Sequence, residues 1–511
     1  MGTPQPFPIA STPGIKRDAT QFEGDEYSEG QWCRFSARGL PKKIGGYQSV
    51  TSHLNEVVRG MDAYMLSAIN HLHLGSRSFL TQVEVTAAGA LGAQNDRTPG
   101  GFAPNVNNLW QIAAFYDVVG GTTMVVAHAG QNLADISSQV ETPIYYGPVG
   151  AITPLVASAM DPVGGGIIPV PPYLMAYGVN GRVDISVAND LTMATANSTF
   201  ATSQKIVKGL RLRNTPAPAA LLWSLDALIT AIFDPAATVA AGGLPTFAFN
   251  EIAEISIMSS QGVVELDSIY YWPGVDRFYM FNGVVRELPN NMNIDFFFDN
   301  FNFAQRQKSF TFKIPRHGEI WFCAPLFGAT ECNWAIIYNT RLNTWYDTPL
   351  PDGGRSAAVF AKVYQKPFMC DLDATATGFT LWQHETGRDK VLGATTLPIL
   401  ANYQTREISP ISRPQGAVDK AYRVAIIEPD FNQTGDIICT VHTRANARTP
   451  EIVSAPLVIP AVATGPADQV NYAKVNGRLM SFKFESNSVG GNFETGRIMG
   501  HIEETDGRIT Q

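Results

Sequence analysis

Six carboxylates in the middle of the chain are the residues whose type best suits catalysis. Glycosidases need two carboxyl groups roughly 5–10 Å apart, one as acid and one as base or nucleophile. The spacing along the chain places no two of these acids face to face, and acids at strand ends commonly form turns. We therefore expect no enzyme activity, and we keep a glycan-cleaving site as the alternative. The six residues are Asp267, Asp276, Glu287, Asp295, Glu319 and Glu331.

The metal and nucleophile motifs of the sequence are incomplete. His384-Glu385 is followed by Thr386-Gly387-Arg388, so the second histidine of a zinc HExxH motif is missing. Asp371-Leu372-Asp373 begins like a calcium loop, but no acid stands at its twelfth position. The chain has neither a GxSxG elbow nor a phosphate-binding P-loop motif. We expect no catalytic residue, no metal and no cofactor.

The five cysteines form no CxxC pair and no metal-ligand spacing. An odd, scattered set is typical of reduced thiols in a protein that folds in a cytoplasm. Two of them flank one expected loop and come near each other there, but we still expect free thiols. They are Cys33, Cys323, Cys332, Cys370 and Cys439.

Charge argues against tight binding of nucleic acid. The 37 basic and 45 acidic residues give a formal charge of −8, whereas proteins that hold DNA through its phosphates are usually basic or carry a basic stripe. The short basic groups, Lys42-Lys43 and Lys205/Lys208/Arg211/Arg213, are expected to be solvated turn and strand ends. The aromatic groups 270–272, 296–298 and Phe301/Phe303 lack interleaved cations, so we expect them in a core or a subunit interface. DNA that passes this protein would then slide by without being held.

The elements that must position these residues are expected to be strands. Only 16% of the residues are charged, and the 45 glycines and 33 prolines suit many strands joined by turns. Asn180-Gly181 and Asn282-Gly283 each separate two apolar runs, which predicts hairpins. Residues 308–346 predict four strands in about forty residues, the length of one propeller blade, with Trp345 packing between neighbouring blades. The sequence predicts an all-β chain with a β-propeller-like core.

The expected domains are an N-terminal arm over 1–54, the propeller-like core over 55–400 and a C-terminal β-sandwich-like region over 401–511. Prolines 4, 6, 8 and 13 argue against regular structure in the arm. The apolar spacing over Ala219–Phe233 predicts one helix, an insertion near 217–233. That stretch is shorter than the ~20 apolar residues of a spanning helix, and the N-terminus lacks a signal-peptide pattern. We expect no membrane insertion.

Several short motifs, in their order along the chain, resemble the tail nozzle or packaged-DNA stabilisation proteins of podoviruses, the short-tailed phages. The likeness covers most of the chain and is most specific over 265–387. The motifs are GIKRD at 14–18, WCRF at 32–35, PKKIGG at 41–46, IYYWPGVDRF at 269–278, NG at 282–283, ELPN at 287–290, GEIWF at 318–322, EC at 331–332, IYN at 337–339, WYDT at 345–348 and LWQHETG at 381–387.

The resemblance implies a structural virion protein, made in the host cytoplasm and located in the phage tail. It implies a homohexameric ring with one propeller per subunit around a channel, placed below a portal-associated adaptor and in contact with tail fibres or spikes. Such a ring retains packaged DNA and conducts it during ejection, with only transient, non-specific DNA contact. The alternatives are a receptor-binding or glycan-cleaving propeller on a virion and, less in keeping with the missing signal peptide, a bacterial surface propeller.

Overall fold

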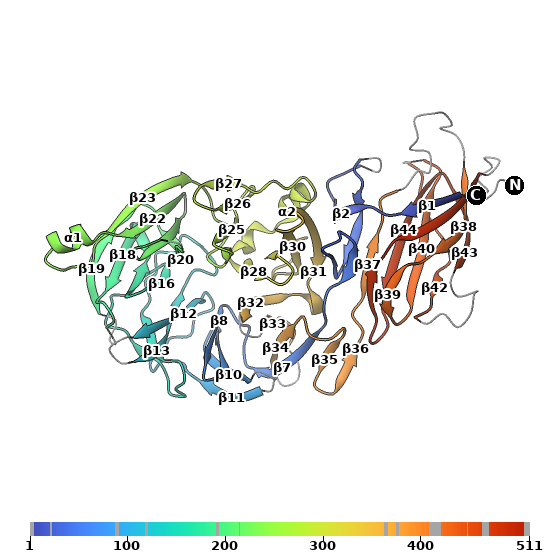
Figure 1. Ribbon diagram of the computed structural model, residues 1–511. Coiled ribbons are helices and arrows are strands. Elements are labelled where there is room, and N and C mark those ends of the chain that lie inside the picture. Colours follow the sequence, from blue (N-terminus) through green and yellow to red (C-terminus); the bar gives the residue numbers. More distant parts are fainter. Residues whose placement is uncertain are drawn as a thin grey trace.

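The protein is a β-propeller joined side by side to a second β-rich body, as the computed structural model shows (Figure 1). The structure describes residues 5–20, 23–86, 91–117, 121–190, 194–213, 215–361, 366–374, 378–407, 421–446, 448–461 and 470–504. Six consecutive four-stranded antiparallel sheets, plus four strands of a six-stranded sheet, make seven blades in the part of the chain described. The all-β, propeller-like fold expected from the sequence is confirmed.

The blades follow the chain in order. Blade 1 contains β8 (Met61–Leu66), β9 (Ile69–Gly75), β10 (Leu80–Thr86) and β11 (Leu91–Asp96); blade 2 contains β12 (Leu109–Asp117), β13 (Thr122–Gly130), β14 (Ile144–Pro148) and β15 (Val156–Ala157). Blade 3 contains β16 (Gly166–Val170), β17 (Tyr173–Tyr177), β18 (Arg182–Ser186) and β19 (Thr195–Phe200); blade 4 contains β20 (Ile206–Arg211), β21 (Ala219–Ser224), β22 (Ala227–Phe233) and β23 (Phe247–Glu254). Blade 5 contains β24 (Val264–Leu266), β25 (Ile269–Pro273), β26 (Phe278–Phe281) and β27 (Val285–Glu287); blade 6 contains β28 (Phe310–Ile314), β29 (Glu319–Ala324), β30 (Trp334–Asn339) and β31 (Thr344–Pro349).

Blade 7 closes the ring with a strand from the other end of the sequence. Its strands β32 (Arg355–Ala361), β33 (Lys366–Asp371) and β34 (Phe379–His384) are followed by β7 (Tyr47–Leu54), which pairs antiparallel with β34. Two further short strands, β35 (Lys390–Leu392) and β36 (Thr395–Leu397), extend the sheet beyond β7. Because β7 is hydrogen-bonded on both sides, the chain preceding blade 1 holds blade 7 in place.

Buried side chains fill every seam between neighbouring blades. Blades 5 and 6, for example, meet where Trp345 contacts Phe278 at 4.8 Å and Phe322 at 6.0 Å between ring centroids. The expected packing of this tryptophan between blades is therefore confirmed, as are the four strands over 308–346. Burial of such aromatic rings supplies most of the free energy that holds blade against blade.

The second body, which we call the terminal β-region, combines both ends of the chain. One sheet is formed by β1 (Gln5–Ile9), β46 (Ile498–Glu504), β38 (Tyr422–Glu428) and β43 (Asn471–Gly477). A second is formed by β4 (Glu29–Gln31), β37 (Ala401–Gln404), β44 (Leu479–Ser486), β40 (Ile437–Arg444), β41 (Ile452–Val453) and β42 (Leu457–Ile459). A third is formed by β39 (Phe431–Thr434), β45 (Asn492–Thr495), β6 (Pro41–Lys43) and β5 (Cys33–Phe35), while β2 (Thr12–Ile15) pairs in parallel with β3 (Glu26–Tyr27).

The expected lack of regular structure over 1–54 is wrong for the described residues. Pro6 and Pro8 lie within β1, which is an edge strand, so one side of each residue needs no ladder hydrogen bond. Residues 5–43 contribute six strands to the terminal β-region, and 47–54 form β7 of blade 7. The segment therefore connects the two bodies by strand pairing.

The expected helix over Ala219–Phe233 is also wrong. The segment forms β21 and β22, which turn around Leu225 and Asp226, where the Ser224 hydroxyl donates to the Asp226 carboxylate at 2.8 Å. Every residue of β21 is buried, because inner strands of a blade are covered on both faces. A strand of that kind is a continuous apolar run that sequence periodicity does not distinguish from a buried helix. The two α-helices of the described chain are α1 (Pro235–Ala240) and α2 (Ile294–Asn300), beside short 3-10 turns at Val179–Gly181, Phe303–Lys308 and Pro351–Gly353.

Both predicted hairpins are present. Asn180 and Gly181 have φ of 53° and 70°, the left-handed pair that the Asn-Gly turn predicts. Asn282-Gly283 joins β26 to β27, but there only Gly283 has a positive φ. The strands expected after residue 400 correspond to β38, β40, β44 and β46, and the Pro-rich stretch 452–461 contains only the short strands β41 and β42.

Candidate functional site: the junction of the two bodies and the mouths of the propeller

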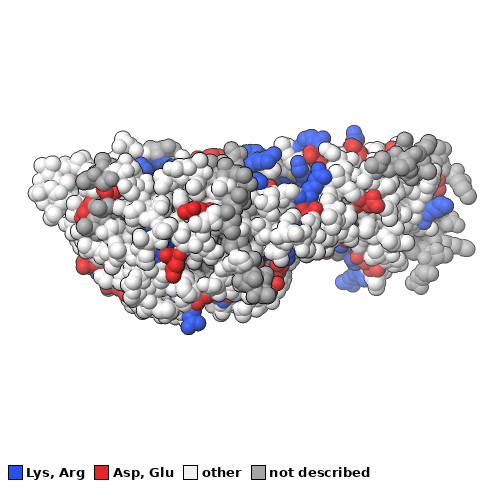
Figure 2. All heavy atoms as spheres, turned by 90° about the horizontal axis from the view of Figure 1, so that it is seen from below, with Lys and Arg blue, Asp and Glu red and all other residues white. Residues whose placement is uncertain are grey.

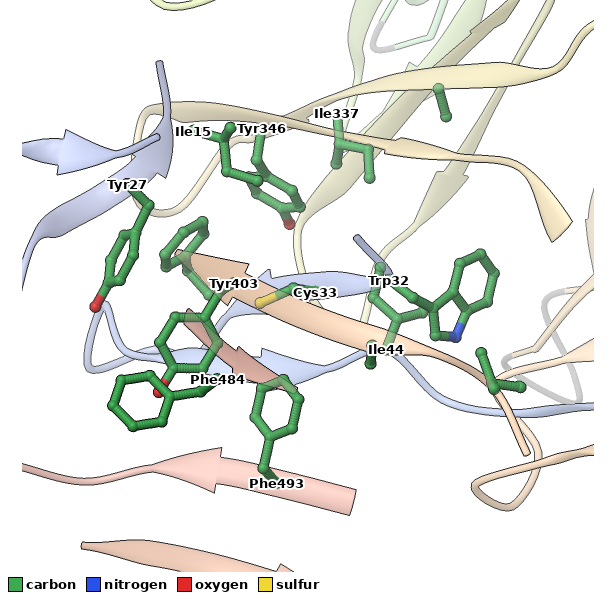
Figure 3. Packing of buried hydrophobic residues seen from close by; sticks show 14 of the residues in the cluster. Ile15, Tyr27, Trp32, Cys33, Ile44, Ile337, Tyr346, Tyr403, Phe484 and Phe493 are labelled. Carbon is green, nitrogen blue, oxygen red and sulfur yellow. The ribbon is translucent and has the colours of Figure 1, made fainter. Parts of the chain in front are cut away.

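The core of the terminal β-region is continuous with the seam between blades 6 and 7. Trp32, Cys33 and Ile44 lie between strands of blade 6 and the terminal β-region (Figure 3). The Trp32 ring contacts that of Trp321 at 6.2 Å, and the Phe35 ring contacts that of Tyr346 at 5.4 Å. One hydrophobic cluster therefore spans both bodies, which couples them rigidly.

A buried ion network lies within this junction. Arg34, in the fully buried strand β5, donates from Nη1 and Nη2 to Glu385 at 2.8 and 2.6 Å and from Nη2 to Glu319 at 3.0 Å. Glu319 also accepts hydrogen bonds from Trp321 Nε1 at 2.9 Å and from the Tyr346 hydroxyl at 2.6 Å. A guanidinium taken out of water needs such partners, because an unpaired buried charge is strongly unfavourable.

The network leaves neither carboxylate available as a general acid. Both acids bind the same guanidinium nitrogen, so their nearest oxygens are close, but Arg34 occupies the space between them. Burial favours the protonated form of Glu385, yet the charge and hydrogen bonds of Arg34 outweigh it and lower the pKa of that carboxyl. The pair fits a permanent ion bridge and does not fit proton transfer to a substrate.

Further contacts attach the first residues of the chain to blade 6 and to α2. Arg17 binds the buried carboxylate of Asp347 in bidentate fashion at 3.1 and 3.0 Å. The Asp18 carboxylate accepts from the backbone N–H groups of Asp295 and Phe296, at 2.8 and 2.7 Å, at the start of α2. The Trp32 backbone N–H donates to the Thr348 hydroxyl at 2.9 Å. These polar contacts fix the orientation of the junction as well as its attachment.

The other candidate carboxylates also have structural contacts. Asp276 and Glu287 are half-exposed and both pair with Arg277. Glu331 accepts from Arg59 at 2.7 and 2.6 Å and from Lys308 at 2.7 Å. Asp267 sits in the turn after β24 with φ of 53°. Among the residues that the structure describes, these acids form no pair facing an open pocket, so the site of a glycosidase is not assembled from them.

The incomplete metal motifs also have structural positions. Asp371 accepts from the Thr380 backbone N–H at 2.8 Å and from Trp382 Nε1 at 2.9 Å, so its carboxylate joins strands of blade 7. His384 is buried beside Tyr47 and next to the Arg355 guanidinium, and burial together with that charge lowers its pKa. Within the described ranges, no group of three or more potential ligands gathers around a common point.

All five cysteines are buried free thiols. Cys323 and Cys332 belong to the junction cluster, where burial raises the pKa of each thiol above its ordinary value. A thiol that stays protonated and out of solvent is a poor nucleophile. These residues pack as small apolar groups.

No helix in the described chain is long and apolar enough to cross a membrane.

The expected aromatic groups mostly occupy cores, but Phe303 is 44% exposed and does not fit that expectation. Tyr270 and Trp272 pack with Trp223 between blades 4 and 5, and Phe297 and Phe301 belong to the cluster between blades 5 and 6. These rings therefore stabilise the seams and do not form a stacking surface for bases. The expectation of a core position holds for them.

The residues of the two basic groups differ in burial, although all of them were expected to be solvated. Lys43 and Lys205 are buried and donate to backbone or amide oxygens, and Lys208 on β20 projects from an innermost strand. Burial lowers the pKa of Lys208 to about 8, although the Asp62 charge on β8 acts in the opposite direction. Because β8 and β20 belong to blades 1 and 4, this electrostatic contact crosses the propeller channel. Arg211 is the last residue of β20 and Arg213 follows it, so both lie at one mouth of that channel.

Cavities occupy both mouths of the propeller. One, of about 760 Å³, lies where the innermost strands β20, β24 and β28 end, and the other, of about 570 Å³, lies where β8, β12 and β28 begin. At the second mouth Arg59 and Lys308 bind Glu331 and Glu56 accepts from Ser76 and Ser78, which leaves Arg77 as the one lining cation without an acidic partner in the described part of the chain. Ligand binding is thus better supported at the first mouth.

Sequence reasoning missed the Arg34 network and the ring closure by β7. The signal for the network was present: Arg34 stands between Cys33 and Phe35, and Glu319 precedes Ile-Trp-Phe. A single charge inside an apolar strand needs a buried partner of opposite sign. The closure by β7 has no such local signal, because its pairing partner lies more than three hundred residues away in the sequence.

No protein-family model matches this chain, and no curated protein matches it. Among solved structures, the chain is similar to BamB from Moraxella catarrhalis, with a TM-score of 0.36 and 12% sequence identity; the match covers 74% of this chain and 98% of that chain. A likeness at this level carries no information on function. The description of the fold therefore rests on the sheet order and the pairing of the strands.

Proposed function

We propose that this chain is a non-enzymatic structural subunit of a short phage tail, a tail nozzle or hub. In this proposal it forms a hexameric ring with copies of itself, binds a portal-associated adaptor and tail fibres or spikes, retains packaged DNA and conducts it during ejection. The proposal starts from the ordered motifs shared with podovirus tail nozzle proteins. In this proposal the chain is located in the tail of the virion.

The observation that carries the proposal is where those motifs meet. The segments 14–18, 32–35, 318–322, 345–348 and 381–387 are far apart in the sequence, yet they supply the Arg17–Asp347 pair, the Trp32–Thr348 hydrogen bond and the Arg34–Glu319–Glu385 network. Short motifs that are joined by direct contacts form one structural unit and are not independent coincidences. This unit is the junction that holds the propeller and the terminal β-region together.

A rigid junction suits a subunit that bears load. DNA held under pressure pushes on its closure, and a subunit whose two bodies moved freely would not keep a defined opening. The shared hydrophobic core and the buried ion network resist such movement. The net charge of −8 also suits a conduit, since an acidic wall repels the phosphates that pass it.

We propose two regions with exposed apolar side chains as the contact patches for partners. The first, on β19, α1 and β23, lies at the end of the propeller away from the terminal β-region and includes Phe200 (67% exposed) and Val239 (79% exposed). The second, on β41 and β42 of the terminal β-region, includes Ile452 and Val458. The side of the propeller seen in Figure 2 carries few charges, whereas lysine and arginine atoms gather near the boundary of the two bodies. Closed rings use two different patches of each subunit, one against the next copy.

Size-exclusion chromatography with light scattering tests the self-association. We expect a mass of several subunits, and we expect Phe200→Asp combined with Val239→Asp to shift the protein to monomer. Val284→Asp is the matched control, because Val284 is 59% exposed on the hairpin between β26 and β27, outside both patches. A chain that stays monomeric at every concentration would contradict self-association in solution.

The alternative of a glycan-cleaving propeller has a direct test. Incubation with host polysaccharide would release new reducing ends if a catalytic carboxylate pair existed. We expect none, because the candidate acids are separated or held in ion pairs. Reducing ends that disappear in a Glu319→Gln or Glu385→Gln variant of normal stability would replace our proposal.

A further inference from the structure

The cavity at the first mouth of the propeller is lined by charged side chains that have no role in the function proposed above. It has a volume of about 760 Å³ and is lined by residues from blades 4, 5, 6 and 7. The innermost strands β20, β24 and β28 all end at it, so its polar side chains come from the last residues of these strands and from the turns that follow. A site built from several blades is held as rigidly as the propeller itself.

The cavity is basic although the chain as a whole is acidic. Arg211, Arg213, Lys313 and Arg316 line it together with two acids, Glu265 and Asp267, which leaves a formal charge of +4 − 2 = +2. Glu265 lies between two of the cations, 3.5 Å from Arg213 and 3.4 Å from Lys313. Burial would raise the pKa of Glu265, but the Ser268 backbone N–H and these two cations lower it, so the carboxylate is charged and neutralises part of the cluster.

Arg211 and Arg316 remain as the available cations. Both are exposed, and within the described chain no carboxylate lies within 4 Å of either guanidinium. They come from β20 in blade 4 and from the β28–β29 turn in blade 6, with Glu265 and Asp267 of blade 5 between them in the order of blades. Two guanidinium groups across one cavity suit a ligand with two anionic groups, because arginine binds carboxylate and phosphate in bidentate fashion.

The remaining lining distinguishes between anionic ligands. The Asp267 carboxylate and the Ser268 and Thr215 hydroxyls provide hydrogen-bond acceptors, and Phe360 provides an aromatic ring. A polyphosphate has no donor for Asp267 and would be repelled by it, whereas a sugar hydroxyl donates to a carboxylate and the apolar face of a sugar packs on a ring. The cavity thus combines groups for sugar carboxylates, sugar hydroxyls and a sugar face.

We propose that this mouth of the propeller binds an acidic oligosaccharide, with Arg211 and Arg316 binding its carboxylates and Asp267 accepting a hydroxyl hydrogen bond. The interaction is non-covalent and involves no bond cleavage. It is independent of the ring proposed above, since it needs only one propeller. A chain that forms no ring can still bind the saccharide, and a chain that binds no saccharide can still form the ring.

Isothermal titration calorimetry with a trimer of α-1,4-linked galacturonic acid tests the proposal. We expect binding that weakens at higher salt, no binding of neutral maltotriose, and a loss of about tenfold or more for each of Arg211→Gln and Arg316→Gln, as for charge-assisted hydrogen bonds. Arg286→Gln is the control, because Arg286 is an exposed arginine on β27, outside the cavity. Unchanged thermal unfolding of each variant shows that the fold is intact.

Asp267→Asn separates the saccharide from other anions. Asparagine tolerates the positive φ of this position, so the turn is kept. The variant should bind the trisaccharide severalfold more weakly, whereas it should bind a polyanion that does not use the carboxylate more tightly. Titration with an oligothymidylate and with a pentaglutamate peptide completes the comparison.

Three results would overturn the proposal. The first is no heat of binding with the trisaccharide, and the second is equal affinity in the Arg211→Gln, Arg316→Gln and wild-type proteins. The third is an oligonucleotide or acidic peptide bound through the same arginines more tightly than the trisaccharide and strengthened by Asp267→Asn. That outcome would assign the cavity to the oligonucleotide or to the acidic peptide, whichever binds more tightly.

Discussion

Arg34 and Glu319 are 285 residues apart in the chain, yet Arg34 Nη2 lies 3.0 Å from Glu319 Oε2, with the arginine 2% exposed and the glutamate fully buried. The arginine belongs to β5 of the terminal β-region and the glutamate to β29 of blade 6. The pair therefore joins the two bodies directly, and Glu385 at the end of blade 7 completes it.

Arg34→Met removes the cation and leaves Glu319 and Glu385 without it in the interior. Breaking a buried ion pair from one side costs about 3–5 kcal/mol of stability. We expect a correspondingly earlier denaturant transition, followed by tryptophan fluorescence because Trp32 and Trp321 lie in the junction. Arg38→Met is the control: Arg38 is 63% exposed in its pair with Glu494, and exposed pairs contribute about 0–1 kcal/mol. Equal effects of both changes would contradict the role of the network.

Val50→Asp tests the closure of the ring by β7. Val50 is buried in the seam between blades 7 and 1, so the variant places an unpaired carboxylate there. We expect loss of several kcal/mol and faster proteolysis at blade 7, measured by limited digestion and mass spectrometry. The exposed Val284→Asp should leave the digestion pattern as it is. Normal stability of Val50→Asp would show that β7 is not needed for closure.

Stability should fall with acid because several buried histidines are neutral, His73 and His128 among them. Burial, aided by Arg97, lowers the pKa of His73 to about 3, and burial with the charge of Lys205 as a further contribution lowers that of His128 to about 4. The unfolded chain binds protons below its histidine pKa of about 6.5 while the folded chain does not, so the free energy of unfolding decreases as pH falls from about 6.5 towards 4. The decrease approaches about 1.4 kcal/mol per pH unit for each histidine.

Denaturant titrations at about pH 7 and about pH 5 measure this slope. His128→Gln should lower stability at neutral pH but reduce its dependence on pH, because the variant lacks a group that stays neutral in the folded chain and binds a proton in the unfolded one. A flat profile for the wild-type protein between these pH values would contradict the neutral, buried state.

Thiol labelling tests the packing of the cysteines. Since all five are buried and their raised pKa values keep them protonated, a disulfide reagent should react with none in the native protein and with all five after denaturation. Rapid native labelling of Cys323 or Cys332 would mean that the seam between blades 6 and 7 is open.

Local patterns predicted the parts of the fold that depend on neighbouring residues. The alternation of Phe310, Phe312 and Ile314, the Asn180-Gly181 turn and the strands after residue 400 were all predicted, since period-two patterns and turn residues act over a few positions. Ala219–Phe233 was predicted as helix because both of its strands are apolar runs without alternation, β21 buried on both faces and β22 buried over most of its length. The prediction for the first fifty residues was wrong because β1, β4 and β7 pair with strands more than three hundred residues away in the sequence.

The contacts of the candidate acids were not predicted for the same reason, because they also join residues far apart in the sequence. Glu319 was recognised as a carboxylate that could act in a site, but its partner Arg34 was seen only as part of a motif. Proximity between residues 285 positions apart follows from the ring closing on itself, and no local pattern encodes it. The mouths of the propeller are likewise assembled from turns of several blades, and spacing along the sequence does not show which turns share a face.

We propose that this chain acts as one subunit of a ring at the DNA exit of a short phage tail. The decisive measurement is a density map of the tail of particles that contain the chain. We expect a hexameric ring around the path of the DNA, with the propeller and the terminal β-region in the fixed relation set by Arg34, Glu319 and Glu385. A map that places the chain as a solitary body away from that path, with an acid-lined cleft open to solvent, would contradict it.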